Sequence, residues 1–191
     1  MKKLTFLAAA FVAALVISCD AVKDTSVTIP FKSNIDLDVA ATVGSTQATA
    51  SKAGAGDYLF EGSATLVGSE ILSAYSEYSS FQEFAVKKVS LAGSSAGTGK
   101  YVRNVEIKAF VGTGTTPFAT FSYPEQFTLS TGSAISNPAD LAAFASSVIM
   151  KMLTSEFITL KAKGYTNLEP DTKLDIKLTI SQASIKVAPF K

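Results

Sequence analysis

Residues 174–187 read Leu-Asp-Ile-Lys-Leu-Thr-Ile-Ser-Gln-Ala-Ser-Ile-Lys-Val, and this stretch decides the fold. Apolar and polar side chains alternate along it, which is the period of a strand with one buried face. The apolar residues occupy even positions up to Ile180 but odd positions from Ala183. Because a shift of one residue turns every following side chain to the other face, the chain must absorb an extra residue at Ser181-Gln182. The stretch therefore predicts a long strand with a β-bulge, or a strand that crosses between two packed sheets.

Shorter alternating segments precede this strand. Residues 27–43 alternate in the same way, and Pro30 within them indicates an edge strand or a bend. The Gly-rich stretch 93–99 separates Val89 and Leu91 from an alternating run and predicts a hairpin. Strands are expected over residues 58–66, 101–111, 117–122, 125–130 and 157–163.

Two segments have helical instead of strand periodicity. The apolar residues of the first recur at spacings of three and four, which predicts a helix over about residues 69–84. The second segment begins at Asn137-Pro138, a capping residue followed by the residue that suits the first helical position. It predicts a helix over about residues 138–155 with a buried stripe of Leu141, Ala145, Val148, Ile149 and Met152.

Many short strands with Gly- and Ser-rich turns and two helices predict a mainly β domain. We expect an antiparallel β-sandwich, immunoglobulin-like or similar, with the two helices packed on it. A barrel decorated with helices is the alternative. Residues 27–191 are expected to form this single domain.

The N-terminal residues predict an export signal. Lys2 and Lys3 are followed by fourteen uncharged residues from Leu4 to Ile17, a run that is too short for a comfortable membrane span. Val16-Ile17-Ser18-Cys19 closes the run and places a small residue before the only cysteine of the chain. These four residues resemble the lipobox of bacterial lipoproteins.

That resemblance implies a location and a partner. Residues 1–18 would be a cleaved signal peptide, Cys19 would be acylated, and residues 19–26 would tether the domain to a membrane. Several acyl chains anchor a protein stably, whereas a single chain is marginal. The expected location is the bacterial cell envelope, with the outer membrane favoured. The inner membrane stays open because Asp20 favours retention there in one well-known sorting system.

Composition excludes several classes of function. The chain has no histidine, and acylation of Cys19 would remove its only thiol, so the commonest general base and thiolate chemistry are both absent. Without Lys2 and Lys3, 15 basic and 16 acidic side chains remain. This near balance gives no reason to expect nucleic-acid binding. We expect neither an enzyme nor a cofactor.

Two local patterns can each be interpreted either as a binding site or as ordinary structure. Asp36 and Asp38 share one strand face and suggest either calcium ligands or, far more commonly, a solvated outer face. The stretch Gly93–Gly99 suggests a phosphate loop, but it lacks the Gly-Lys-Ser/Thr ending and no helical pattern follows. Both segments are therefore interpreted as structural.

Two classes of function remain. The preferred one is a lipid-anchored envelope protein with a structural or protein-interaction role, for which envelope proteins are candidate partners. The alternative is a binding module or carrier for a small apolar ligand or lipid, held between sheet and helix. An unfilled groove lined by Phe118, Phe121, Ile149 and Met152 would favour the carrier, and a filled core would favour the first class.

Overall fold

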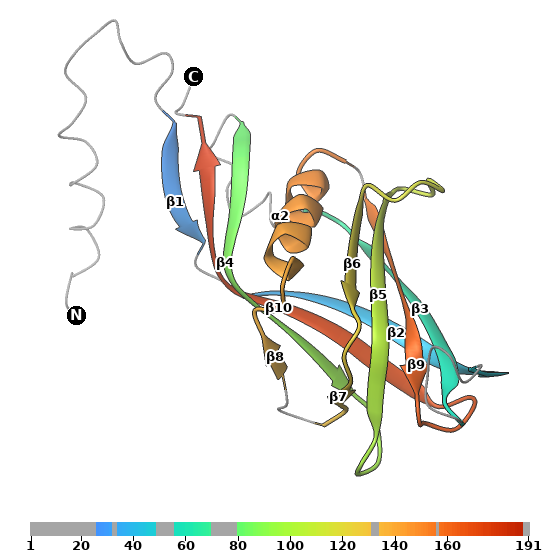
Figure 1. Ribbon diagram of the computed structural model, residues 1–191. Coiled ribbons are helices and arrows are strands. Elements are labelled where there is room, and N and C mark those ends of the chain that lie inside the picture. Colours follow the sequence, from blue (N-terminus) through green and yellow to red (C-terminus); the bar gives the residue numbers. More distant parts are fainter. Residues whose placement is uncertain are drawn as a thin grey trace, which may run out of the picture.

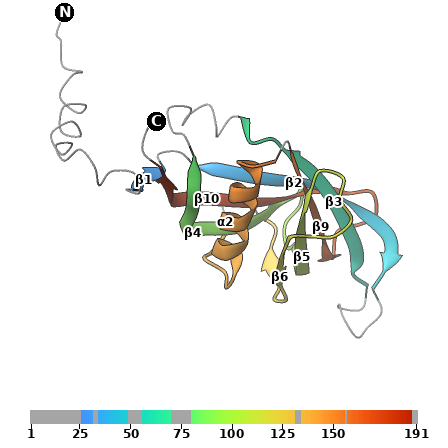
Figure 2. The same ribbon diagram turned by 90° about the horizontal axis from the view of Figure 1, so that it is seen from above.

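The computed structural model describes residues 26–31, 34–48, 56–69, 80–130, 134–155 and 157–188. These residues form a curled antiparallel sheet with the helix α2 on its inner side (Figures 1 and 2). The prediction of a mainly β, antiparallel fold is confirmed. In chain order the elements are β1 (Val27–Phe31), β2 (Ile35–Gln47), β3 (Tyr58–Leu66), β4 (Phe81–Ser94), β5 (Tyr101–Val111), β6 (Ala119–Tyr123), β7 (Phe127–Thr128), β8 (Ala134–Ser136), α2 (Leu141–Met152), β9 (Ile158–Thr166) and β10 (Lys173–Val187).

Strand β10 is the central strand of the sheet. Residues 173–180 pair with β2, residues 183–187 pair with β1, and β4 pairs with β10 along most of its length. Strand β1 thus takes the place of β2 beyond the middle of β10. Among the described strands β1 pairs only with β10, so the edge position predicted from Pro30 is confirmed. An edge strand tolerates proline because its outer side needs no ladder donors.

The irregularity predicted at Ser181-Gln182 is a β-bulge. The register of β10 against β4 shifts there, and Ser181 of β10 and Lys87 of β4 both lie outside the pairing. Both side chains are exposed, and the buried positions of the two strands change phase at the same place. One additional residue on each strand lets the ladder continue while the sheet bends.

The described strands form one sheet of ten strands. Its order is β6-β5-β9-β3-β2-β10-β4-β8, with β1 on β10 and β7 on β5. Figure 1 shows this sheet curling into a half-barrel. The predicted two-sheet sandwich is not confirmed, because β4 and β10 change phase together and the ladder bends without dividing into two sheets.

The predicted hairpin between residues 89–91 and 101–111 is wrong in its pairing. Both segments are strands, but β4 lies between β10 and β8, whereas β5 lies between β9 and β6. Residues 95–100 connect β4 to β5 without making them neighbours in the sheet. Alternation identifies the buried face of a strand but not the strand beside it, so proximity in sequence suggested the wrong partner.

Helix α2 lies against the inner side of the half-barrel and contacts β4 and β6 (Figure 2). It begins at Leu141 and ends at Met152, within the predicted range of 138–155. The predicted stripe is confirmed and gains one aromatic residue. The buried residues of the helix are Leu141, Phe144, Ala145, Val148, Ile149 and Met152.

The predicted start of this helix at Asn137 is wrong. Asp140 occupies the capping position in a left-handed conformation with φ of 64° and makes no capping hydrogen bond through its side chain. Asn137 instead bonds to β4: its Oδ1 accepts from the Val89 amide at 2.9 Å, and its own amide donates to the Val89 carbonyl at 2.8 Å. These two bonds continue the pairing of β8 with β4.

The helix predicted over residues 69–84 falls mainly on residues 70–79, which lie outside the described residues. Its last part is wrong, because Phe81 to Phe84 belong to β4. Phe84 is buried there, pairs with Ile185 of β10 and packs its ring edge-on against Phe31, with centroids 5.5 Å apart. Phe84 is buried through contacts with β10 and β1, which the local spacing of apolar residues does not reveal.

A buried polar cluster links Asp57, the residue before β3, to strand β5. Asp57 is 2% exposed, and its Oδ2 lies 2.7 Å from Nε of Arg103. Its Oδ1 accepts a 2.7 Å hydrogen bond from the Tyr101 hydroxyl, which in turn accepts one from Arg103 at 2.9 Å. Burial and the hydrogen bond to Asp57 raise the pKa of Tyr101, so its hydroxyl remains a donor. The ion pair and the two hydrogen bonds thus link a buried carboxylate to two half-buried side chains of β5.

Truncation of the helix stripe should be costly. Ile149 is fully buried, so we expect Ile149→Ala to lower the free energy of unfolding by about 2–5 kcal/mol through lost contacts and a cavity. The exposed Lys151 provides the control, and Lys151→Ala should be near neutral. Urea unfolding followed by circular dichroism measures both. Equal and small losses would contradict the packing of α2 on the sheet.

Removal of the buried carboxylate should also destabilise the domain. We expect Asp57→Ala to lower the free energy of unfolding by about 2–3 kcal/mol, because Arg103 and Tyr101 lose their shared acceptor. Glu61→Ala removes an exposed acid from the adjoining strand and should stay within about 0.5 kcal/mol of wild type. Chemical unfolding of the two variants side by side is the measurement, and equal stabilities would show that the cluster contributes nothing.

Candidate functional site

The space between α2 and the sheet is filled. Of the four residues expected to line an apolar groove, Phe121, Ile149 and Met152 are at most 4% exposed and belong to the core, and Phe118 packs against it. The Phe121 ring also lies 6.1 Å from the ring of Phe144 on the helix. These apolar side chains therefore pack on one another.

The sequence-predicted lipidation site lies elsewhere. Cys19, Asp20 and the lipobox fall outside the described residues, so the acylation of Cys19 stays a prediction. Among the described residues, no helix is both long enough and apolar enough to cross a membrane.

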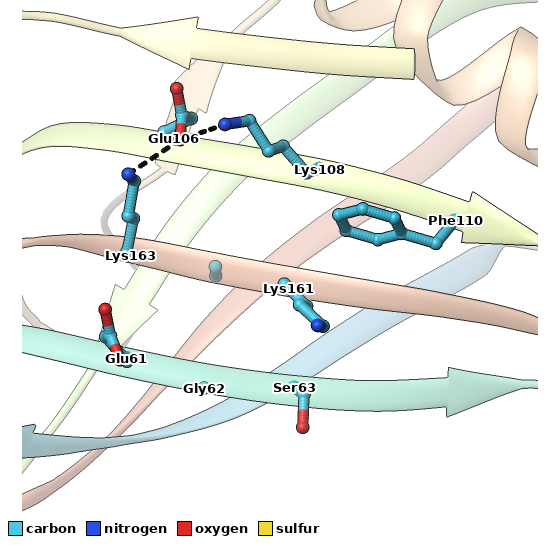
Figure 3. A pocket seen from close by; sticks show the side chains of 9 residues that line it. Glu61, Gly62, Ser63, Glu106, Lys108, Phe110, Lys161 and Lys163 are labelled. Carbon is cyan, nitrogen blue, oxygen red and sulfur yellow. Dashed lines mark ion pairs between the residues drawn. The ribbon is translucent and has the colours of Figure 1, made fainter. Parts of the chain in front are cut away.

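The outer face of the sheet carries a hollow of about 400 Å³ over β3, β9 and β5. Figure 3 shows side chains from all three strands converging on it. We call this hollow the outer trough. Its lining combines charged side chains with one aromatic ring: Glu61, Gly62, Ser63, Glu106, Lys108, Phe110, Lys161, Ala162 and Lys163.

An ion triad occupies one side of the outer trough. Oε1 of Glu106 lies 3.0 Å from Nζ of Lys108 on the same strand and 3.2 Å from Nζ of Lys163 on β9 (Figure 3). The hydrogen bond from Lys108, joined by that from Lys163, lowers the pKa of Glu106 against the opposing effect of burial. Both lysines share one carboxylate, so the triad carries a net positive charge.

The other side of the outer trough holds a cation above an aromatic ring. Nζ of Lys161 lies 5.0 Å from the ring centroid of Phe110, within the range of a cation–π contact. Phe110 is only 6% exposed although it faces the outer side of the sheet. Among the described residues, Lys161 has no ion pair.

A second hollow of about 290 Å³ adjoins the outer trough and shares Glu106 and Lys163 with it. This second hollow is more apolar. Tyr123 on its rim donates a 3.1 Å hydrogen bond to Glu125, and burial raises the pKa of that tyrosine. Its lining is Leu59, Asn104, Val105, Glu106, Ser122, Tyr123, Pro124, Lys163, Gly164 and Tyr165.

The aspartates considered as calcium ligands face a lysine. Nζ of Lys177 on β10 lies 2.7 Å from Oδ2 of Asp36 and 3.9 Å from Oδ1 of Asp38. The Lys177 ammonium holds the pKa of the Asp36 carboxyl below its usual range, and Thr179 donates a further 2.7 Å hydrogen bond to Asp36. An ammonium group thus occupies the position between the two carboxylates.

The described part of the chain brings together no set of three ligating side chains that could hold a metal ion. The Gly-rich stretch considered as a phosphate loop leads into the strand β5. In the outer trough Ser63 supplies a hydroxyl, but histidine is absent from the whole sequence. The arrangement is suited to electrostatic and hydrogen-bonding recognition.

The outer trough was not predicted from the sequence. The polar positions that line it were visible as the exposed half of two alternating strands, but alternation does not identify neighbouring strands. Only the pairing of β9 with both β3 and β5 places Glu61, Lys163 and Glu106 side by side.

Comparison with family models, curated proteins and solved structures found no match to this chain in any of the three.

Proposed function

We propose that this protein is a lipid-anchored protein of the bacterial cell envelope that acts through protein contacts or as a structural element, without catalysis. Its anchor is the lipid on Cys19. The outer membrane is the favoured location, and Asp20 leaves the inner membrane open. Residues 19–26 tether the domain that begins at β1.

The filled space between sheet and helix is the observation that favours the first class of function over the second. A carrier needs a cavity between sheet and helix, and α2 instead packs fully buried side chains there. Phe121, Ile149 and Met152 make contacts within the core that a bound ligand would have to displace. This packing supports an interaction or structural role over transport of an apolar ligand.

The outer trough supports a role in protein contacts. It presents charged groups from three strands on a face away from the core. Strands of a paired sheet are rigid supports, so these groups are held in fixed positions relative to one another. Sites of this kind recognise a partner through charge and hydrogen bonding.

The anchor is tested by substitution of the cysteine. Cys19→Ser should abolish incorporation of labelled palmitate and stall processing, because only a thiol accepts the lipid. The matched control is Ser18→Ala, which keeps a small residue before the cysteine and should still be labelled. Metabolic labelling followed by immunoprecipitation measures both. A mature, unlipidated protein that begins at another residue would overturn the anchor.

The carrier alternative is tested by native mass spectrometry. The core residues in the described part of the chain lie between Ile29 and Val187, so a chain of residues 20–191 retains them. We expect this chain to be soluble and to carry no bound lipid. A stoichiometric adduct of lipid mass that solvent extraction removes would contradict the preferred function and support the carrier.

A further inference from the structure

Two rows of side chains cross the outer face of the sheet at the outer trough. In the first row Lys163 of β9 lies opposite Glu61 of β3 and Glu106 of β5. In the second row, two residues along the strands, Lys161 lies opposite Ser63 and Lys108. Residues two apart on a strand share a face and are separated by about 7 Å.

The first row carries one cation and two carboxylates, so one carboxylate is spare. Its cation, Lys163, lies between two acids and forms its ion pair with Glu106. Glu61 is exposed on the opposite side and has no ion pair among the described residues. A cationic group brought to Glu61 would therefore find an available carboxylate.

The second row is not balanced. Lys108 and Lys161 lie directly opposite each other, an arrangement of like charges that destabilises a sheet. Lys108 turns toward Glu106 on its own strand, while Lys161 lies over the ring of Phe110. The hydroxyls of Ser63 and Thr120 flank the two lysines in the register. Lys161 has no ion pair among the described residues, so it is the cation of this row that is available to a carboxylate, with the Ser63 hydroxyl beside it.

The surroundings favour a single anionic group over a polyanion. Glu61 and Glu106 lie in the neighbouring row, so a continuous line of phosphates or an anionic lipid surface would meet repulsion one step from the lysines. An isolated carboxylate over Lys161 meets less of this repulsion, because Glu106 is paired with Lys108 and Lys163 instead. A cation two residues away from that carboxylate on the ligand would in addition reach Glu61.

We propose that the outer trough binds an extended segment of a partner protein in which an acidic residue and a basic residue are two positions apart. The acid lies over Lys161, and the base lies over Glu61; neither side chain has an ion pair among the described residues. Side chains two positions apart on an extended chain match the spacing of the two rows. This inference rests on the proposed role in protein contacts and names the chemistry of the partner.

Carbodiimide coupling tests the contact directly, because it joins a carboxylate to an adjacent amine as an amide. The probe is the peptide acetyl-Gly-Ser-Ser-Glu-Ser-Lys-Ser-Ser-Gly-amide, mixed at low salt with the full chain in non-ionic detergent. Mass spectrometry of the digest locates the amides. We expect coupling of the peptide Glu at Lys161 to exceed coupling at the exposed strand residue Lys173 about fivefold, the equivalent of one exposed ion pair.

Variants separate binding from general reactivity. Glu61→Gln should reduce coupling of the peptide Glu at Lys161 about fivefold, because the peptide Lys then loses its ionic partner. The matched control Lys173→Gln should leave coupling at Lys161 unchanged. Circular dichroism checks that both variants fold. A peptide with Gln in place of Glu should give no peptide amide at Lys161, and Glu61 of the unsubstituted chain should couple to the Lys of the original peptide.

The remaining outcomes overturn the inference. Equal coupling at all exposed lysines would show that the outer trough does not select the peptide. Binding of phosphatidylglycerol vesicles that is lost in Lys161→Gln, without selective peptide coupling, would assign the lysines to a lipid headgroup. The coupling does not involve Cys19, so its failure is distinguishable from failure of the palmitate labelling that tests the anchor.

Discussion

The extra residues Ser181 of β10 and Lys87 of β4 lie on either side of the pair Gln182–Lys88, and the shape of the sheet depends on this double irregularity. An extra residue on one strand alone would turn its following side chains away from those of its partner. With one on each strand, both buried faces change phase together and the ladder continues through a bend. The bend lets β1 replace β2 beside β10, and it brings α2 against β4 on the inner side.

The sequence predicts the strands well and their neighbours poorly. The phase change at Ser181-Gln182 was visible because apolar side chains must stay on one face, so the bulge could be located to the residue. The stripe of α2 was visible for the same reason. Which strand lies beside which depends on contacts between distant residues, and a short Gly-rich connection is weak evidence for pairing. The hairpin of β4 with β5 is wrong on that point, and the two-sheet sandwich is not confirmed.

The candidate site, like the fold, could be predicted strand by strand but not in the pairing of its strands. The sequence suggested binding sites only within single segments, such as the aspartates of β2 or the glycines after β4. The outer trough draws its groups from three strands that are far apart in the chain, and each group alone looks like an ordinary solvated residue. The one clue in the sequence is that acids and lysines alternate with apolar residues in β5 and β9. Their juxtaposition follows from strand pairing, which the pattern does not encode.

The position of β10 has a consequence for the time at which the chain folds. This strand follows every other described strand in sequence, yet it pairs with β1, β2 and β4. During synthesis these three strands leave the ribosome without the strand on which they assemble. Since such distant pairings form slowly and only when both partners are present, the half-barrel cannot close until β10 has been synthesised. Until then β2 and β3 can pair with each other, as can β5 and β6, but β1 and β4 have no partner strand against which to complete the bend.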